Sequence, residues 1–270
     1  MRAGDFWHNG NVSSSSLIDW FHGPLPPGVR AGFTSVRGGS STGEYASLNL
    51  GFHVGDDRGA VEANRKRFEG SIGQSVAWMN QVHADHIADF RDSRLEAGFL
   101  NVGDADAIVV DRGQAAAVMV ADCVPLILVA ASGERGAVVH VGRAGLDLGI
   151  GPAAVERLGE DVIAILGPSI CGRCYEVSPQ LADEVGGRWP ASRATTSWGT
   201  PALDIPAGLE TQLRECGVSE IHRSPVCTYE SAEHYSHRRA THGRTQTGRF
   251  VGVLQIVRHT GVVRGNSRFL

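Results

Sequence analysis

Short apolar runs separated by polar and glycine-rich turns recur along the chain from about residue 28, and most of them predict β-strands. The runs are mostly four to eight residues long and rich in Val, Ile, Leu and Ala, which favours buried strands over helices. On this basis we expect strands over residues 29–36, 76–82, 107–110, 115–120, 124–130, 136–141, 162–166 and 250–257.

Four segments between these strands carry the spacing of helices instead. The clearest is 61–70, which Asp56 and Asp57 precede as helix-start signals. The others are 150–158, 180–185 and 206–216. Because strands come both as near neighbours and separated by helices, the pattern predicts an α/β (α+β) fold in which helices flank mixed β-sheets.

The chain shows neither an internal repeat nor a linker long enough to separate two domains. Residues 1–27 are weakly patterned, with a serine run followed by a Gly-Pro-rich stretch, and we expect a loosely packed N-terminal leader there. We therefore predict a single catalytic domain over residues 28–270.

Composition and charge indicate the cellular location and the kinds of partner that we expect. The net charge of −4 gives no overall electrostatic signal for nucleic acid. The sequence contains neither an apolar run of 18 residues nor a signal-peptide pattern, so we expect no membrane partner. Five cysteines are an odd number at low density, which favours a reducing cytoplasm. Composition does not separate a monomer from a homodimer.

Three side chains near the ends of apolar runs are candidate metal ligands, namely His83, Cys123 and His140. Catalytic zinc sites combine His nitrogen and Cys thiolate in sets of three and leave a position open. Their spacing matches no zinc signature, however. Spacing alone therefore leaves a buried cysteine and two hydrogen-bonded core histidines as the favoured interpretation.

Other patterns compete for a metal. Cys171 and Cys174 form a C-x-x-C pair without a second such pair, and we interpret them as a turn with two incidental thiols. A multicopper oxidase needs about ten histidines, mostly paired as H-x-H. The chain has eleven histidines but no H-x-H. Copper polyphenol oxidase (laccase) chemistry is therefore disfavoured, with copper kept only as an alternative metal.

An ordered set of motifs covering most of the chain resembles the YfiH-like family. This family is described as polyphenol oxidase or laccase-domain proteins, as peptidoglycan editing factors, and as purine nucleoside phosphorylases with adenosine deaminase activity. The matching blocks are Thr34-Ser35-Val36-Arg37-Gly38-Gly39, Tyr45-Ala46-Ser47-Leu48-Asn49-Leu50-Gly51, His53-Val54-Gly55-Asp56-Asp57, Asn80-Gln81-Val82-His83, Asp104-Ala105-Asp106-Ala107, Ala121-Asp122-Cys123-Val124-Pro125, Leu166-Gly167-Pro168-Ser169-Ile170, Cys174-Tyr175-Glu176-Val177, Cys227-Thr228-Tyr229, Ser236-His237-Arg238-Arg239 and Thr247-Gly248-Arg249.

The resemblance implies a layered sandwich fold and one zinc ion on His83, Cys123 and His140. It implies phosphorolysis of adenosine, inosine and methylthioadenosine to the base and ribose 1-phosphate, together with deamination of adenosine. The substrates would be a small nucleoside and phosphate. An alternative within the same family is a hydrolase that edits peptidoglycan precursors, with Cys123 as a nucleophile activated by a histidine.

Within the matching blocks, further residues are candidates for substrate binding or catalysis. Arginine forks are natural phosphate ligands, and a hydroxyl beside a glycine turn can add a neutral donor. The candidates are Arg37, Arg238 and Arg239 with Ser35 for the phosphate, and Asp122 and Glu176 beside Cys123 for catalysis. A solvated surface role for the arginines and a turn role for the two acids remain open.

One block departs from the family pattern. The family usually reads His-Ala-Gly-Trp-Arg-Gly from its third ligand, whereas this chain reads His140-Val141-Gly142-Arg143-Ala144-Gly145. The ligand is kept, but the wall of the pocket changes. Because an arginine can both reach a shifted contact and stack on a base, we expect Arg143 to line the pocket and contact the substrate. The alternative is that Arg143 points to solvent.

Overall fold

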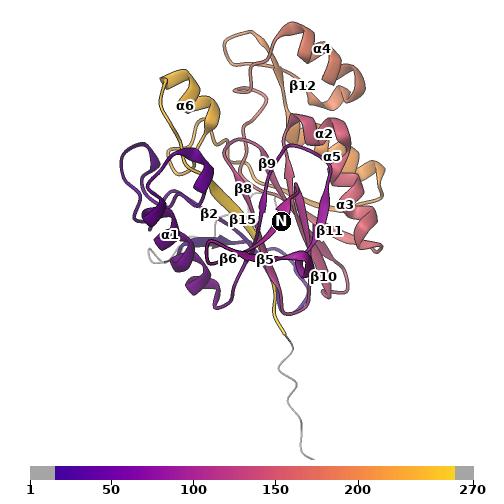
Figure 1. The fold of residues 1–270 in the computed structure, drawn as a ribbon. Coiled ribbons are helices and arrows are strands. Elements are labelled where there is room, and N and C mark those ends of the chain that lie inside the picture. The colour runs from indigo at the N-terminus through magenta and orange to yellow at the C-terminus, as the bar shows by residue number, and fades with distance from the viewer. Residues whose placement is uncertain (1–15, 259–270) are drawn as a thin grey trace, which may run out of the picture.

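Two β-sheets packed face to face form the centre of the fold (Figure 1). The structure, a computed structural model, describes residues 16–258. The larger sheet has seven strands in the order β1-β2-β15-β8-β3-β6-β5, with bounds Ile18–Trp20, Val29–Thr34, Phe250–Ile256, Ala115–Val120, Ala77–Asn80, Phe99–Asp104 and Arg94–Glu96. The smaller has six in the order β14-β11-β9-β10-β7-β4, with bounds Glu220–Arg223, Val162–Leu166, Val124–Ala130, Arg135–Val141, Ala107–Asp111 and Ile87–Asp89. A separate hairpin pairs β12 (Arg193–Thr195) with β13 (Pro201–Leu203).

Helices cover the outer faces of both sheets and complete a four-layered arrangement. Helix α1 (Arg58–Ile72) buries Phe68 against Trp78 on the larger sheet. The outer face of the smaller sheet packs against α2 (Arg143–Leu148), α3 (Ile150–Leu158) and α5 (Ile205–Glu215). The predicted mixed-sheet sandwich with flanking helices is therefore confirmed. Among the described residues, no helix is long and apolar enough to cross a membrane.

Strand register in the smaller sheet determines which side chains meet at one of its ends. β10 runs antiparallel to β7 and to β9, with Val139 opposite Ala107 and Val141 opposite Val124. The residues just before β7 and β9, and the last residues of β10, therefore lie at the same end of the sheet. β4 runs parallel to β7, so the loop before β4 reaches this end as well.

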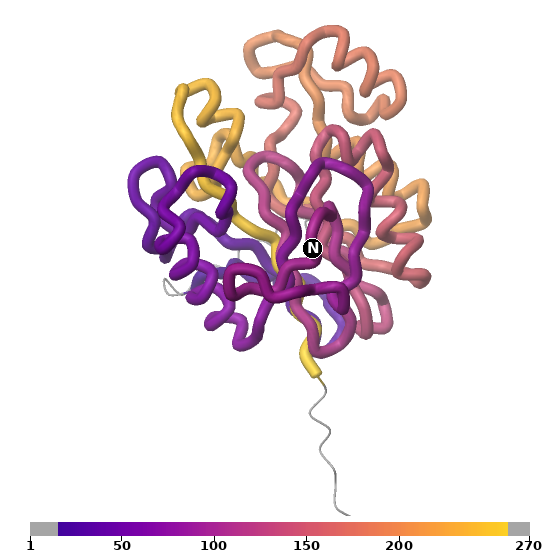
Figure 2. The backbone as a smooth tube through the Cα atoms, viewed as in Figure 1, coloured from indigo at the N-terminus to yellow at the C-terminus, as the bar shows by residue number. Residues whose placement is uncertain are grey.

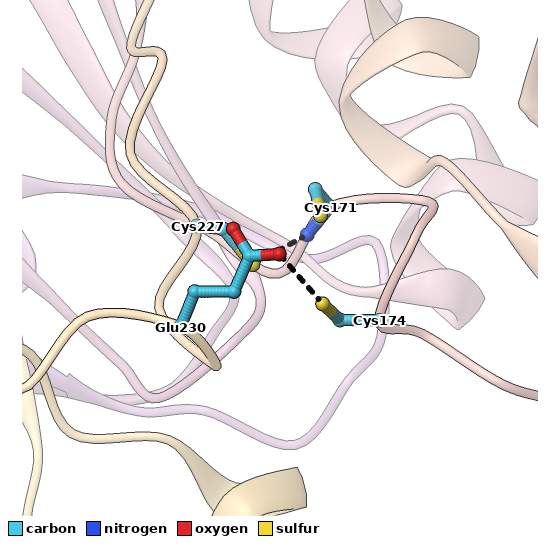
Figure 3. A group of neighbouring side chains, drawn as sticks. All are labelled: Cys171, Cys174, Cys227 and Glu230. Carbon is cyan, nitrogen blue, oxygen red and sulfur yellow. Dashed lines mark hydrogen bonds between the residues drawn. The ribbon is translucent and has the colours of Figure 1, made fainter. Parts of the chain in front are cut away.

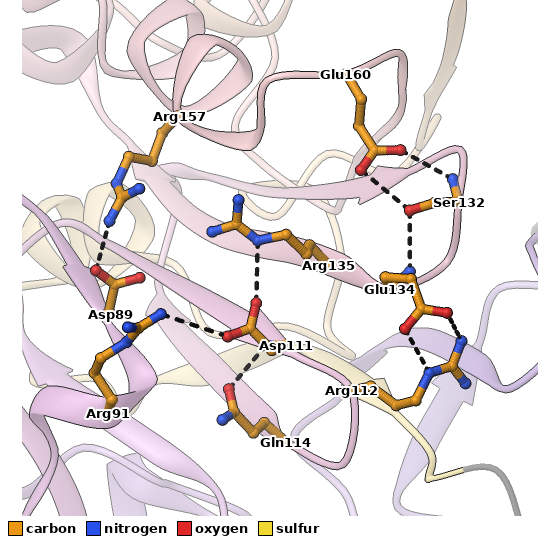
Figure 4. Close-up of polar contacts among 10 residues, drawn as sticks. All are labelled: Asp89, Arg91, Asp111, Arg112, Gln114, Ser132, Glu134, Arg135, Arg157 and Glu160. Carbon is orange, nitrogen blue, oxygen red and sulfur yellow. Dashed lines mark hydrogen bonds and ion pairs between the residues drawn. The ribbon is translucent and has the colours of Figure 1, made fainter.

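The opposite end of β7 and β10 carries solvated ion pairs (Figure 4). Asp111 accepts from Arg135 Nε at 3.0 Å, and Arg91 lies 3.7 Å from its other carboxylate oxygen. Further pairs link Arg112 with Glu134 and Arg157 with Asp89, while Ser132 binds Glu160. Because most of these side chains are well exposed, each pair contributes little to stability, and this end has the character of an ordinary polar surface.

The C-terminal part of the chain packs beside the N-terminal loops at the end of the larger sheet where β2 ends and β15 begins. Figure 2 shows these segments in yellow and indigo. Tyr235 donates from its hydroxyl to the carbonyl of Tyr45 at 2.6 Å. Val36 N donates to the carbonyl of Glu233 at 2.9 Å. These bonds hold the segment before α6 (His237–Gly243) against the body of the domain.

The predicted leader differs in part from the structure. Residues 1–15 lie outside the described residues, but β1 joins the larger sheet and Ile18 is only 2% exposed. The described residues of this segment are thus partly packed, because Ile18 and Phe21 are buried in the hydrophobic cores on either face of the larger sheet. The sequence also did not predict α2, α6 or the short strands at the sheet edges.

Candidate metal site

His83, Cys123 and His140 converge at the end of the smaller sheet, with their ligand atoms all within 4.8 Å of one another. Cys123 directly precedes β9, and His140 is the second-last residue of β10. His83 comes from the loop between β3 and β4, and its ring lies edge-on to that of His140 with centroids 4.7 Å apart. The two imidazoles and one thiolate are a donor set that suits a zinc ion with an open position.

The buried carboxylate of Asp106 hydrogen-bonds to His140 and to the loop that carries His83. Its Oδ1 lies 2.7 Å from Nδ1 of His140, so the other ring nitrogen of His140 is left for a metal. The same carboxylate accepts backbone N–H bonds from Val82, His83 and Ala84, at 3.2, 3.1 and 2.7 Å. Metal-binding histidines usually carry such a carboxylate on their second nitrogen. A single buried side chain therefore orients one ligand directly and the loop of another.

The backbone around the triad is unusual for residues other than glycine. His83 has φ of 60° and Asp122 has φ of 90°, values that such residues rarely adopt. Gly142 lies against the site, since a Cβ at this position would sit 3.0 Å from Sγ of Cys123 and 3.4 Å from Cδ2 of His83. The local backbone is thus shaped so that three ligands from distant strands fit into one small volume.

The charges of the triad explain the acidity of the thiol. Burial raises the pKa of Cys123, but the charge and hydrogen bonds of His140 and His83 outweigh it and lower the pKa to about 6. Burial lowers the pKa of His140, but Cys123 and Asp106 outweigh it and raise the pKa to about 9. Without a cation, the cysteine and His140 therefore form a thiolate–imidazolium pair. A divalent cation would take the place of the proton between them.

A cavity of about 520 Å³ opens directly onto these ligands. This volume is in the range of small-molecule sites. The cavity has candidate metal ligands, cationic groups, an aromatic ring and aliphatic side chains in its wall. The lining residues are His83, Ala121, Asp122, Cys123, Val141, Gly142, Arg143, Ala144, Ile170, Tyr175, Ile205, His237 and Arg238.

Asp122 fixes Arg238 at the cavity wall. Its Oδ2 accepts the backbone N–H of Arg238 at 2.6 Å, and its Oδ1 accepts from the hydroxyl of Thr228 at 2.7 Å. The guanidinium of Arg238 donates to the carbonyl of Glu176 at 2.6 Å and lies 4.8 Å from the centre of the Tyr175 ring. That bond uses one of five guanidinium N–H donors. Both carboxylate oxygens of Asp122 therefore have hydrogen-bond partners, and the side chain serves to position Arg238.

Arg143 is the first residue of α2 and lies in the wall of the same cavity, as the pocket role requires. Its side chain is 38% exposed and pairs with Asp147 at 3.2 Å. Arg143 and Arg238 thus bring two guanidinium groups to the space beside the candidate metal ligands. Contact of Arg143 with a substrate remains a proposal.

Four other candidates lie outside the cavity lining. Arg37 is 62% exposed and pairs with Glu233 at 2.9 Å, and the hydroxyl of Ser35 accepts the backbone N–H of Arg37. The carboxylate of Glu176 accepts from Trp198 Nε1 at 2.8 Å. We therefore assign these three side chains to local structure and not to the site.

Arg239 also has a structural place, despite being next to Arg238 in the sequence. Its guanidinium donates to four backbone carbonyls of the loop before α6, at 2.5–3.1 Å. Because α6 begins at His237, consecutive side chains on it point in different directions. One arginine reaches the cavity and the other stabilises the loop, a separation that the R-R pair in the sequence does not reveal.

Sequence reasoning gave no role to Asp106, Tyr175 or His237. Asp106 had one signal, since an aspartate flanked by two alanines directly precedes a strand whose first four residues are buried. Tyr175 and His237 lie within motif blocks but carry no pattern of their own that points to a cavity. Their presence follows from the packing of the loops before α4 (Pro179–Arg188) and α6 onto the sheet end.

Comparison with known proteins identifies relatives over nearly the whole chain. Residues 30–257 match the family described as multi-copper polyphenol oxidoreductase laccase. A purine nucleoside phosphorylase of Streptomyces coelicolor is 47% identical over 235 residues, which cover 83% of this chain and 94% of the relative. The purine nucleoside phosphorylase YfiH of Shigella flexneri is 34% identical over 229 residues, covering 80% of this chain and 90% of the relative.

Solved structures show the same fold. The crystal structure of a Neisseria meningitidis protein matches with a TM-score of 0.80 at 30% identity, and covers 90% of this chain and all of the other. The matched residues therefore include nearly all of both sheets and the loops that form the candidate site. The resemblance to YfiH-like proteins is confirmed.

Proposed function

The chain belongs to the multi-copper polyphenol oxidoreductase laccase family, and from this membership and the site geometry we propose that it is a zinc-dependent purine nucleoside enzyme. The proposed reaction is phosphorolysis of adenosine, inosine or methylthioadenosine to the free base and ribose 1-phosphate, with deamination of adenosine as a second activity. The names of the curated relatives support the substrate class. We propose a cytoplasmic location, where the five free cysteines stay reduced.

The observation that carries the proposal is that metal ligands and two arginines face one cavity. Phosphorolysis needs a phosphate held against the anomeric carbon and charge stabilisation on the departing base. Arg238 supplies the first requirement as a guanidinium fork, while Arg143 lies in the same wall to contact the nucleoside. The triad of His83, Cys123 and His140 would meet the second requirement, because a divalent metal bound there would act as a Lewis acid beside the two arginines.

The remaining lining residues can hold the nucleoside. In the proposed step, a phosphate oxygen bonds to ribose C1′ as the bond from C1′ to the base nitrogen breaks. Tyr175 offers an aromatic face on which a purine can stack, while Ile170 and Ile205 exclude water from the reacting atoms. Asp122 acts as a positioning residue, since it holds the backbone of Arg238.

Two arginines from the sequence prediction provide a matched test. Purified protein is assayed with adenosine and with inosine, with and without phosphate, while its metal content is measured. Arg238→Ala is expected to raise the KM for phosphate about 10- to 100-fold, as the loss of a charge-assisted hydrogen bond predicts. Arg37→Ala is the control and should leave that KM unchanged, because Arg37 lies outside the cavity. Equal effects of both changes, or neither product in the wild type, would contradict the proposal.

The lowered pKa of Cys123 also fits a second candidate, the peptidoglycan-precursor hydrolase with a nucleophilic thiol. The two candidates differ in what the thiol does. If one zinc ion is bound, Cys123 should resist alkylation in the metal-loaded protein and react after metal removal. Rapid alkylation of the metal-loaded protein, together with the absence of nucleoside products, would favour the hydrolase.

A further inference from the structure

A second group of metal-ligating side chains lies in the described part of the chain, apart from the triad (Figure 3). Three cysteines and one glutamate converge from two segments, with one ligand atom of each within 4.8 Å of the others. They are Cys171, Cys174, Cys227 and Glu230. We propose that these four side chains form a structural binding site for a second soft divalent cation such as zinc.

The first pair comes from a tight turn between β11 and α4. The carbonyl of Cys171 accepts backbone N–H bonds from both Cys174 and Tyr175 at 3.0 Å. This turn brings the two thiols of the C-x-x-C sequence to the same side, as in zinc sites with this spacing. The proposed site replaces the interpretation of these cysteines as incidental thiols, because the fold brings two further candidate ligands to them.

The second pair has the same spacing but ends in a carboxylate, which is why no second C-x-x-C was visible. The carbonyl of Cys227 accepts from the backbone N–H of Ser231 at 3.0 Å and closes the turn that contains Glu230. Thr228 N donates to the carbonyl of Ser169 at 3.1 Å and joins this turn to the segment that leads into the first one. Backbone bonds therefore bring the two turns together independently of any metal.

The spacing of the ligand atoms fits a tetrahedral ion. Zinc–sulfur bonds of about 2.3 Å place neighbouring ligand atoms about 3.5–3.8 Å apart, and small side-chain rotations achieve this from separations within 4.8 Å. Cys174 and Cys227 are 2% and 6% exposed. In addition, the backbone N–H of Cys171 points at Sγ of Cys227 at 3.4 Å, a contact that stabilises a metal-bound thiolate.

The charge around the group also suits a cation site. Three thiolates and a carboxylate around one divalent ion leave an excess of negative charge. The guanidinium of Arg173 lies 3.3–3.4 Å from both carboxylate oxygens of Glu230, on the outside of the group, and offsets part of this excess. A disulfide between two of the thiols would explain neither the third thiol nor the inward carboxylate.

This site would fasten together two segments of the substrate cavity. Ile170 and Tyr175, on either side of the first turn, line the cavity. Thr228, within the second turn, donates to Asp122 at 2.7 Å. A cation held by both turns would therefore fix the cavity wall without contacting a substrate.

Metal analysis of the full chain, purified without chelator, tests the inference separately from enzymatic activity. Wild type is expected to contain about two metal ions per chain. Cys227→Ser and His83→Ala should each retain about one, and the double variant should retain none. Cys216→Ser, which changes an exposed cysteine outside both groups, should retain two. A Cys227→Ser protein with the same metal content as wild type would overturn the second site.

Cobalt substitution provides a readout that a purely structural cysteine would not change. In His83→Ala protein loaded with Co²⁺, three thiolates should give strong thiolate-to-cobalt charge-transfer absorption, which Cys227→Ser should reduce. Because Cys227 is buried, the exposed Glu230→Gln change serves as a variant with little risk to folding, and should weaken Co²⁺ binding at least about tenfold. Unchanged affinity, or a Cys171–Cys174 disulfide in non-reducing peptide maps, would overturn the proposal.

Discussion

Replacing Asp106 with asparagine changes one buried carboxylate oxygen into an amide nitrogen and keeps the shape of the side chain. In the wild type, Oδ1 bonds His140 Nδ1 and the N–H of His83, while Oδ2 accepts the N–H groups of Val82 and Ala84. Asparagine has one acceptor oxygen and one NH₂ donor. Whichever way the amide turns, its NH₂ group therefore faces groups that need an acceptor.

The two orientations have different costs. If the amide oxygen stays at His140, the bonds to Val82 and Ala84 are lost; at about 1.5–3 kcal/mol for each bond to a charged acceptor, the free energy of unfolding falls by about 3–6 kcal/mol. If the NH₂ group faces His140 instead, Nδ1 must become an acceptor, and the proton moves to the nitrogen that would bind metal. Zinc affinity is then expected to fall about 10- to 100-fold, as for other losses of a carboxylate behind a histidine ligand.

Competition with a chromogenic chelator measures the zinc Kd, and chemical denaturation measures the free energy of unfolding. Asp104→Asn is the matched control: it is the last residue of β6, two positions before Asp106, is exposed, and accepts a hydrogen bond of 3.4 Å from Asn80. It should leave both quantities near wild type. If Asp106→Asn bound zinc as tightly as wild type and unfolded with the same free energy, the role given to this carboxylate would be refuted.

Four further predictions concern the same site. In metal-free protein, alkylation of Cys123 should reach half its maximal rate near pH 6, where its lowered pKa lies, and a midpoint near 9 would contradict the geometry. The lowered pKa of Cys123 (from about 9 to about 6) and the raised pKa of His140 (from about 6.5 to about 9) change stability with pH in opposite directions, so their contributions cancel between about pH 6.5 and 9. Urea unfolding of metal-free protein should therefore show a plateau in stability across this range, and a slope of one proton per pH unit would contradict the pairing. Gly142→Ala should weaken zinc binding about tenfold or more, because its Cβ would press on Sγ at 3.0 Å; Gly70→Ala, in open space on α1, should not. Arg143→Ala should raise the KM of the nucleoside with zinc content and stability nearly unchanged, because its ion-pair partner keeps a second arginine at 3.4 Å; wild-type kinetics would place Arg143 outside the substrate contacts.

The central strands could be predicted from the sequence because their apolar runs are continuous. The predicted ranges 115–120, 124–130 and 162–166 coincide with β8, β9 and β11, and 150–158 coincides with α3. Short edge strands such as β4 and β5 have three residues each and depend on their neighbours for pairing. Helix α2 was missed because a six-residue segment with a central glycine carries little helical signal.

The candidate site was harder to predict, because its members are distant in the sequence and meet through strand register. The candidate metal ligands were predicted from a family resemblance and not from their spacing. His83 was expected at the end of a strand, but β3 ends at Asn80 and His83 adopts a positive φ. That conformation follows from the bonds that the Asp106 carboxylate makes with the loop. No local pattern around residue 83 contains this information.

Asp122 shows how the parts of the site depend on one another. Its φ of 90° carries a cost of about 1–3 kcal/mol for a residue other than glycine. Three hydrogen bonds hold it there: its carboxylate binds Thr228 and Arg238, and its carbonyl accepts from the backbone N–H of Ile170 at 2.9 Å. Because Cys123 follows directly, Asp122 links a candidate metal ligand, an arginine of the cavity, and the two turns that carry Cys171 and Cys227. A shift in any one of these segments would therefore be transmitted to the others through the side chain and backbone of Asp122. This coupling explains how a cavity wall that is built from distant loops has a defined geometry.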